Sequence, residues 1–251
     1  MLIIDNKLVP TPGYTALNWR DNPVFRMKLG EDGMARGNAR VNMVGIHTTE
    51  GVRATIKPGV KDHHQGAQQY IQSWKNSPRQ ASAHMLIGWD GLVYQIADLQ
   101  TEMAYHIPGV NAVSIGIEIV QIDGVLYDGQ FYTLGLLCTQ LSEYFGIQPM
   151  VHLPYHGHAV PRIEHGEFFG FFGHRDAAND RGYGDPNDEP LTYLRDHAKF
   201  EAFDVEKDED RTAWKARQVE LGVKTDGVPG ASTFTALKTA GYKNGIWTYG
   251  R

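Results

Sequence analysis

The middle of the chain has the hydrophobic pattern of a buried β-sheet. Residues 41–47 form an almost continuous apolar run, which predicts a buried strand. The apolar segments AHMLIGW and LVYQIA flank Asp90 and Gly91, which form a two-residue turn signal. We therefore expect these two segments to pair as a β-hairpin.

A third predicted strand, residues 114–122, alternates in character along its length. Its three isoleucines share one face, which places Gly116, Glu118 and Val120 on the other face. A carboxylate flanked by apolar residues on a strand has to be solvated, paired or functional. Glu118 is therefore a candidate functional residue.

Helical spacing of apolar residues predicts helices on both sides of this strand. One helix is expected to begin at Asp62 and to end near Trp74. A second is expected over residues 130–145, with Gly146 as its stop signal and Cys138 buried in its apolar face. Residues 189–203 predict a third helix.

Two stretches lack a clear period. Residues 1–40 are rich in Gly, Pro and Asn, and we expect an extended arm or an irregular lead-in. Residues 147–165 are expected to form a loop, and they contain His152, His156, His158 and His165. These histidines allow a second metal site, but a solvated loop is the preferred interpretation.

A run of charge divides the chain near its C-terminus. The segment DVEKDED, residues 204–210, has no apolar residue after Val205. We therefore predict a first domain over residues 1–203, an acidic linker over 204–210 and a small helical domain over 211–251. In the last of these, RTAWKARQVELG and ASTFTALKTAG each predict a helix. So short a module has a marginal core and is expected to depend on docking to the first domain.

Composition narrows the class of protein. The 251 residues are 41% hydrophobic and 21% charged, as in soluble globular proteins. A net charge of −5 argues against binding to nucleic acid. No apolar run is long enough to cross a membrane, and the N-terminus does not resemble a secretion signal. With its single cysteine, the chain is expected to be made in the cytoplasm and to have no membrane partner. The sequence does not reveal the oligomeric state, for which a monomer is the default expectation.

Three residues have the chemistry of one metal site. His47 ends the first apolar run, His174 follows another, and Asp185 lies in a loop rich in Gly, Pro and Asn. Two imidazoles and one carboxylate leave one coordination position of Zn²⁺ open for water. A nearby carboxylate such as Glu118 can then transfer protons. The sequence therefore outlines a zinc hydrolase.

Ordered segments support this interpretation. IHTTEG, SAHMLIGWDGLVYQIADLQTEMAYHIPG, NAVSIGIEIV and GHRDAANDRGYGDP resemble the zinc-dependent N-acetylmuramoyl-L-alanine amidases, a family that includes phage amidases and peptidoglycan recognition proteins. The resemblance covers about residues 41–190 and implies an α/β fold, with a mixed central β-sheet flanked by helices. The stretch RQVELGVKTDGVPGASTFTALK resembles small helical peptidoglycan-binding domains.

The resemblance also implies roles for particular residues. His47, His174 and Asp185 correspond to the ligands of one Zn²⁺, and Glu118 corresponds to the catalytic glutamate. The substrate-binding positions that it implies are Tyr105, His106 and Asn111.

One position departs from the family pattern. Many relatives have a lysine two residues before the aspartate ligand, where it stabilises developing negative charge. This chain has Tyr183 there, so Arg181 and Tyr183 are left as alternative catalytic donors, with His106 as a further candidate.

The implied activity is hydrolysis of the amide bond between N-acetylmuramic acid and L-alanine in peptidoglycan. The absence of a recognisable signal and the wall-binding module favour an endolysin, which is released through holin-made holes and lyses the host cell wall. A cytoplasmic wall-recycling amidase and a non-catalytic peptidoglycan recognition protein are the alternatives.

Overall fold

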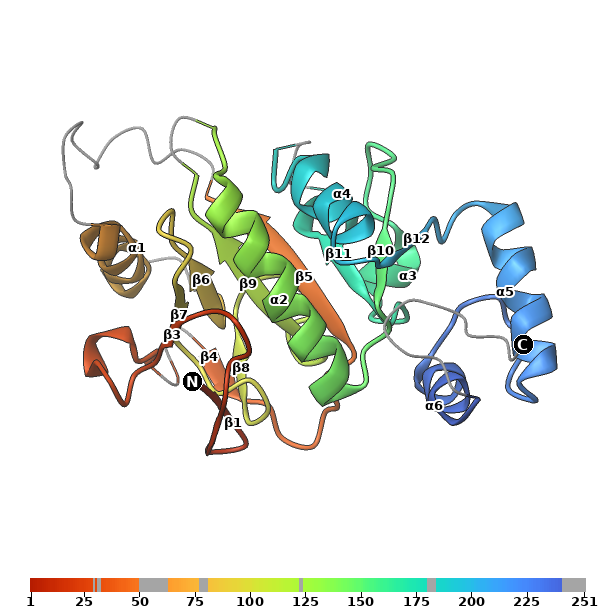
Figure 1. The fold of residues 1–251 in the computed structure, drawn as a ribbon, viewed down its shortest axis with the longest axis horizontal. Coiled ribbons are helices and arrows are strands. Elements are labelled where there is room, and N and C mark those ends of the chain that lie inside the picture. The colour runs from red at the N-terminus through yellow and green to blue at the C-terminus, as the bar shows by residue number, and fades with distance from the viewer. Residues whose placement is uncertain are drawn as a thin grey trace.

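A mixed eight-stranded β-sheet forms the centre of the computed structural model, which describes residues 1–28, 30, 33–49, 63–76, 81–121, 124–179 and 184–240 (Figure 1). In sheet order, its strands are β12 (Glu201–Phe203), β10 (Met150–His152), β11 (Phe171–Gly173), β5 (Met43–Thr48), β9 (Ser114–Ile119), β6 (Met85–Ile87), β7 (Val93–Gln95) and β3 (Ala16–Leu17). The first six are parallel to one another, and β7 and β3 run in the opposite direction.

Helices cover both faces of this sheet. They are α1 (His63–Asn76), α2 (Asp128–Phe145), α3 (Pro161–Glu164), α4 (Asp188–Asp196), α5 (Asp208–Glu220) and α6 (Ala231–Thr239), with short 3₁₀ turns η1 (Pro23–Phe25) and η3 (His174–Asp176). Two small two-stranded sheets pair β1 (Leu2–Ile4) with β2 (Lys7–Val9), and β4 (Gly33–Ala35) with β8 (Glu102–Ala104). None of the helices in the described ranges is long and apolar enough to span a bilayer.

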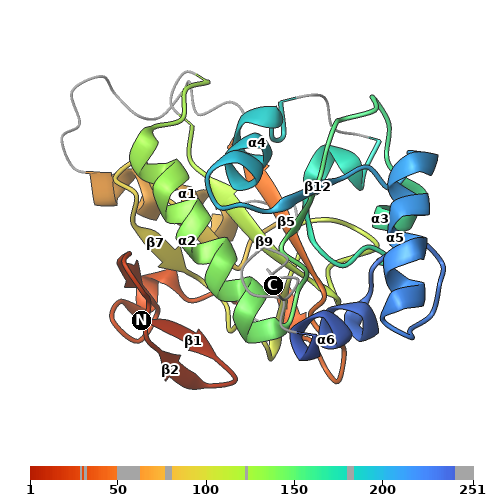
Figure 2. The same ribbon diagram turned by 45° about the vertical axis from the view of Figure 1, so that its right-hand side comes forward.

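The two faces of the sheet have different cores. On one face, apolar residues of α2 and α4 pack on the odd-numbered isoleucines of β9 and on Val44 and Ile46 of β5. On the other face, α1 packs near β6 and β7, while α3, α5 and α6 pack near β10 and β12 (Figure 1, Figure 2). The described helices on the second face form two separate groups, and polar side chains lie between them at the carboxyl ends of β5 and β9.

Several sequence predictions are confirmed. Strand β5 occupies the first apolar run, and β6 and β7 form the antiparallel hairpin around Asp90 and Gly91. In β9 the isoleucines are buried against α2, and Glu118 is on the opposite face, half-buried. Gly146 ends α2 in the left-handed conformation, and the Cys138 thiol is fully buried in the core. The predicted mixed sheet with flanking helices is thus the observed fold.

The N-terminal region is more regular than the sequence predicts. Within residues 1–40, β1 and β2 form a hairpin, β3 joins the edge of the main sheet, and β4 pairs with β8. Each strand has two or three residues, which is too short to show a period. The hairpin turn has positive φ at Asp5 and Asn6, and the Asp98 carboxylate accepts hydrogen bonds from both of their backbone N–H groups.

Two further predictions are wrong in part. The predicted loop over residues 147–165 contains β10 and α3. The predicted helix over residues 189–203 ends at Asp196, and its last residues form the edge strand β12. Lys199 has a φ of 63°, which turns the chain between the two elements. The pairing of β12 with β10 over a long sequence separation is invisible to local periodicity.

The acidic segment 204–210 contains a buried residue and the start of a helix. Val205 is buried, and α5 begins at Asp208. Trp214 of α5 and Leu237 of α6 belong to the same apolar cluster as Phe203 of β12. The C-terminal helices therefore pack on the sheet, as expected for a module with a small core. The division into three units stays a prediction.

Two glycines face each other in the centre of the sheet. Gly45 of β5 is in register with Gly116 of β9, and the imidazole of His106 lies over both. A Cβ atom at Gly116 would lie 2.6 Å from His106 Cγ, and one at Gly45 would lie 3.2 Å from His106 Cε1. The missing side chains thus create the space that a buried imidazole occupies.

We therefore predict that Gly116→Ala destabilises the protein, by about 1–3 kcal/mol, because the added methyl group forces His106 out of position. Gly129→Ala is the matched control, since an added Cβ meets nothing at this exposed position in α2. It should raise stability by about 0.4–1 kcal/mol. Urea unfolding monitored by circular dichroism measures both changes. Equal stabilities for the two variants would contradict the account of the glycine pair.

Candidate metal centre and catalytic cleft

Three predicted ligands meet at the carboxyl edge of the parallel strands. His47 is near the end of β5, His174 follows directly after β11, and Asp185 lies in the loop before α4. Their donor atoms all lie within 4.8 Å of one another, and all three side chains are buried. Strand pairing brings β11 and β5 together, so residues far apart in sequence reach one point.

The distances at this point fit a metal ion. The two imidazole Nδ1 atoms of His47 and His174 are 3.0 Å apart. The Asp185 carboxylate lies 3.1 Å from His174 Nδ1 and 3.7 Å from His47 Nδ1. Two donors that are each about 2.0–2.1 Å from a tetrahedral ion lie about 3.3 Å from one another. The three residues therefore match the geometry of a three-ligand metal site.

A chain of hydrogen bonds fixes the proton positions behind His47. The Ser114 hydroxyl donates to the Val110 carbonyl at 2.6 Å, so it must accept from His106 Nε2 at 2.8 Å. A neutral His106 then has a lone pair on Nδ1, which accepts a hydrogen bond from His47 Nε2 at 3.0 Å. His47 consequently has no proton on Nδ1, the atom that points at His174 and Asp185.

Electrostatics keep His106 neutral. Burial lowers its pKa well below the ordinary value, and the neighbouring His84, His174 and Arg36 lower it further. Burial also lowers the pKa of His84, which lies beside the Arg36 guanidinium. The direction of the hydrogen-bond chain is therefore stable at neutral pH.

The turn η3 holds His174 and links it to the Asp185 loop. Arg175 donates its backbone N–H to the Asp185 carbonyl at 3.0 Å, and its buried guanidinium forms an ion pair with Asp188 at the start of α4. The Asp185 carboxylate also accepts a hydrogen bond from the Thr48 backbone N–H at 3.2 Å. These contacts orient the carboxylate toward the two histidines.

Burial would by itself raise the pKa of Asp185. The hydrogen bond with His174, the two neighbouring imidazoles and the hydrogen bond from the Thr48 backbone N–H outweigh this effect and lower the pKa. Asp185 is therefore ionised, as a metal ligand has to be.

A cleft of about 180 Å³ opens beside these ligands. The residues that line it are His47, Thr48, Thr49, Tyr70, Trp74, Ala81, Ser82, Tyr105, His106, Glu118, His174 and Asp185. Glu118 is directly opposite His47 in the register of β5 and β9. The strand pairing thus places a carboxylate beside the metal-binding atoms without making it part of the three-residue cluster.

Tyr70 of α1 is a cleft residue that the sequence analysis missed. Burial raises its pKa to about 12, and the nearby charge of Glu118 adds to this effect. Its phenol therefore stays protonated and can donate a hydrogen bond. No local pattern marks this residue, because its position depends on how α1 packs against the sheet.

The other predicted residues have different positions. Tyr105 and His106 line the cleft, although His106 also supports His47 from behind. Asn111 is not among the cleft residues in the described part of the chain, and its Oδ1 instead accepts hydrogen bonds from the backbone N–H groups of His106 and Ile107. The contact between Asn111 and substrate stays a prediction. Arg181 and Tyr183 lie outside the described residues.

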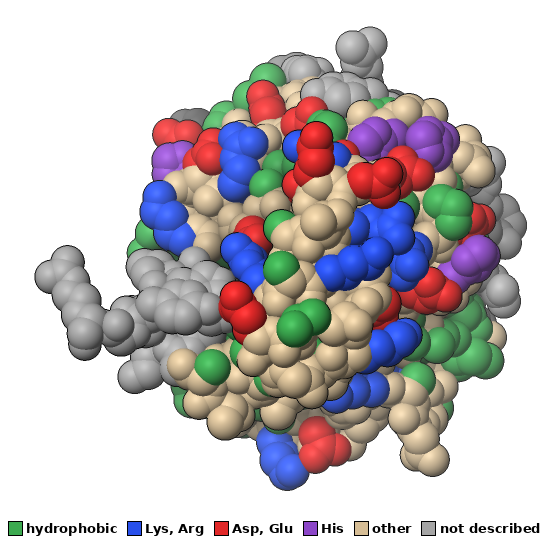
Figure 3. All heavy atoms as spheres, turned by 90° about the vertical axis from the view of Figure 1, so that its right-hand side faces the viewer, with side chains coloured by type: hydrophobic (Ala, Val, Ile, Leu, Met, Phe, Trp, Pro, Cys, Tyr) green, Lys and Arg blue, Asp and Glu red, His purple; other side chains and the backbone are tan. Residues whose placement is uncertain are grey.

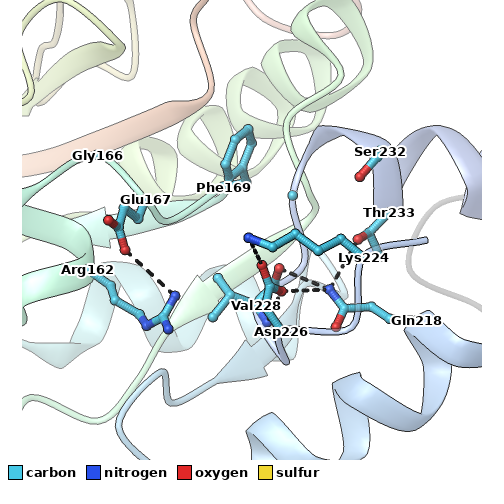
Figure 4. Close-up of a pocket in the computed structure, with 11 residues that line it drawn as sticks. Arg162, Gly166, Glu167, Phe169, Gln218, Lys224, Asp226, Val228, Ser232 and Thr233 are labelled. Atoms are coloured by element: carbon cyan, nitrogen blue, oxygen red, sulfur yellow. Dashed lines mark hydrogen bonds and ion pairs between the residues drawn. The ribbon is translucent and has the colours of Figure 1, made fainter.

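A larger cavity, of about 670 Å³, lies between the sheet domain and the C-terminal helices (Figure 4). Its charged side chains are paired with each other, Arg162 with Glu167 and Lys224 with Asp226. It lacks a cluster of metal-binding donors among the described residues. The smaller cleft is therefore the better candidate for catalysis.

Comparison with known proteins gives a family match. Residues 37–188, more than half of the chain, match the profile of the Amidase_2 family, described as N-acetylmuramoyl-L-alanine amidase. The matched range contains every residue of the candidate metal centre. No curated protein is significantly similar to the chain.

Solved structures are similar at low sequence identity. Drosophila PGRP-LB is 15% identical with a TM-score of 0.50, over 74% of this chain and 96% of that one. The N-acetylmuramoyl-L-alanine amidase LysC from Clostridium intestinale is 18% identical, with a TM-score of 0.45, over 74% and 99%. A mutant endolysin from Bacillus subtilis is 16% identical, with a TM-score of 0.47, over 72% and 97%. At such identities the likeness concerns the fold.

The hydrogen-bond chain predicts that His106→Phe weakens metal binding. The substitution keeps an aromatic ring over the glycine pair but removes the acceptor for His47 Nε2–H. The dissociation constant for Zn²⁺, measured by competition with a chromophoric chelator, should rise about 10–100-fold. Tyr105→Phe, in the same cleft, is the control and should leave this constant unchanged. Equal constants in all three proteins would argue against the supporting role of His106.

Proposed function

The chain belongs to the N-acetylmuramoyl-L-alanine amidase family, and on that premise we propose that it hydrolyses the amide bond between N-acetylmuramic acid and L-alanine of peptidoglycan, with one Zn²⁺ bound. The observation that carries the proposal is the convergence of His47, His174 and Asp185 beside Glu118 in one cleft. Three ligands leave a coordination position free, which is typical of catalytic rather than structural zinc sites.

The metal and the protein divide the chemistry. When bound, Zn²⁺ supplies a Lewis acid that polarises a carbonyl oxygen and lowers the pKa of water toward about 7. His47, His174 and Asp185 would hold the ion. Their burial excludes bulk water from the ligands, and the hydrogen bond to His106 keeps the His47 ring in its binding orientation.

Glu118 is the proposed general base and acid. Its carboxylate lies on the cleft face of β9, opposite His47, so it can reach a water molecule at the metal centre. It accepts the proton of the attacking water and then delivers it to the nitrogen of the departing L-alanine. An amine is a poor leaving group until it is protonated, so the C–N bond breaks as the second transfer takes place.

The negative charge on the substrate oxygen requires a further donor. Tyr70 fits this role, because its phenol lines the cleft and stays protonated at neutral pH. Arg181 and Tyr183 are the donors proposed from the sequence. Tyr70 is the donor that the described contacts support.

We also propose that the protein acts on intact cell walls, as an endolysin does. The support is the C-terminal pair of helices α5 and α6, whose sequence resembles peptidoglycan-binding domains. A recycling amidase acts on small soluble fragments and does not need such a module. Activity on insoluble sacculi compared with soluble muropeptides distinguishes the two roles.

Glu118→Gln is expected to retain the metal and to lose hydrolysis by a factor of about 10²–10⁴, since an amide cannot accept the proton. His47→Ala is expected to lose the ion at the catalytic centre as well as hydrolysis. Zinc content is measured by atomic emission, activity by the loss of turbidity of purified walls, and the bond by mass spectrometry of the products. Free lactyl groups with intact stem peptides identify an amidase.

Glu143→Gln, on the exposed surface of α2, is the matched control for this experiment and should retain full activity. Wild-type activity in Glu118→Gln would remove Glu118 as the base. Cleavage within the stem peptide would refute the proposed bond, and binding to walls without cleavage would favour a recognition protein.

Tyr70→Phe should lower kcat by a factor of about 10²–10³ while leaving zinc content and KM nearly unchanged, because the lost hydrogen bond forms mainly in the transition state. Steady-state kinetics with a soluble muropeptide provide the measurement. Unchanged kcat would assign the donor role to another residue.

A further inference from the structure

A second group of metal-binding side chains lies on the same edge of the sheet. His152 is the last residue of β10, and Asp204 directly follows β12, the neighbouring strand. His156 comes from the loop after β10. Their donor atoms lie within 4.8 Å of one another. The group lies outside the candidate catalytic cleft.

His152 is the most informative member of this group. Its side chain is fully buried, and neither ring nitrogen has a hydrogen-bond partner among the described residues. An imidazole always presents at least one N–H group, and when neutral also one lone pair. Buried polar atoms without partners are rare in native proteins, so each requires an explanation, and ion binding is one such explanation.

Both nitrogens of His152 face carboxylates. Nδ1 lies 3.5 Å from Asp176 Oδ2, and Nε2 lies 3.9 Å from Asp204 Oδ1. Asp176 Oδ1 is also buried without a hydrogen-bond partner in the described chain. In a metal-binding histidine one nitrogen faces a carboxylate and the other is directed toward the ion, and Asp176 and Asp204 stand beside the two nitrogens of His152 in this way.

His156 and Asp204 complete the set at the surface. His156 Nε2 lies 2.8 Å from Asp204 Oδ1, and the His156 side chain is about a quarter exposed, so an ion has a route in. Glu206 and His158 lie just outside, 3.0 Å apart. On the face of the molecule formed by α5, histidine side chains lie beside acidic ones near the top of the view (Figure 3).

We propose that His152 Nε2, His156 Nε2 and Asp204 Oδ1 bind a second Zn²⁺, with Asp176 orienting His152. Zn²⁺ binds well to a set of two imidazoles and one carboxylate, whereas Ca²⁺ and Mg²⁺ bind mainly through oxygen atoms. To reach the spacing of about 3.3 Å between two ligands of one zinc ion, His152 Nε2 has to move closer to Asp204 Oδ1 than 3.9 Å, and His156 Nε2 has to move slightly away from its present 2.8 Å. The sequence interpretation of residues 147–165 as a solvated loop is wrong for His152, which is buried in β10.

The position of this site gives it a structural role. It joins the end of β10, the loop that follows it, and the segment between β12 and α5. An ion there ties the start of the C-terminal helices to the sheet. Because Asp176 belongs to η3, the same turn that holds His174, the second ion also supports the turn that carries a ligand of the first.

The test is the zinc content of the full-length protein, after saturation with Zn²⁺ and removal of loosely bound metal by gel filtration. The wild type should retain two ions per chain. His156→Ala and Asp204→Asn should each retain one, His47→Ala should retain one, and the double variant His47→Ala/His156→Ala should retain none. His165→Ala, an exposed histidine of the same region, is the control and should retain two.

Stability provides a second measurement that does not depend on hydrolysis. In the His47→Ala background, added Zn²⁺ should raise the thermal unfolding temperature, and His156→Ala should abolish that rise. One ion in the wild type and also one in His156→Ala would overturn the proposal, as would two ions in both. Because the His47→Ala background removes the catalytic ion, failure of the proposed amidase reaction does not affect either measurement.

Discussion

The lone pair on His47 Nδ1 is the constraint on which the candidate centre depends. It faces His174 Nδ1 at 3.0 Å and the ionised Asp185 carboxylate. Electron pairs from three groups repel one another unless a positive charge lies between them. A proton on His174 Nδ1 satisfies part of this arrangement, and a metal ion satisfies all of it. The site is thus preorganised for a cation before any substrate is considered.

The position of that lone pair is determined by residues that are not metal ligands themselves. Ser114 can donate only to the Val110 carbonyl, and this fixes His106 and then His47. The chain exists because Gly45 and Gly116 leave a gap in the sheet wide enough for the His106 ring. Every link is buried and paired, which is the condition under which a polar network specifies a geometry instead of destabilising the core.

The parts of this arrangement that depend on local pattern or on ordered motifs could be predicted from the sequence. The strands with His47 and Glu118, and the helix with Cys138, follow from periodicity, and the ligand set follows from the family resemblance. Local pattern does not reveal β12, because its three residues form a strand only by pairing with β10. It also does not reveal that Tyr70 of α1 lines the cleft. Spacing alone also does not show the structural role of Asn111, whose side chain accepts hydrogen bonds from the backbone N–H groups of His106 and Ile107.

Parallel strands explain why two groups of ligands occur along one edge. The carboxyl ends of β5, β11, β10 and β12 lie side by side, so residues that end or follow these strands are neighbours whatever their distance in sequence. His174 and Asp176 both belong to the turn after β11, which lies between the other strands. His174 is directed toward β5 and Asp176 toward β10. A shift of this turn toward one group draws it away from the other, so the position of His174 depends on how firmly Asp176 is held on the opposite side.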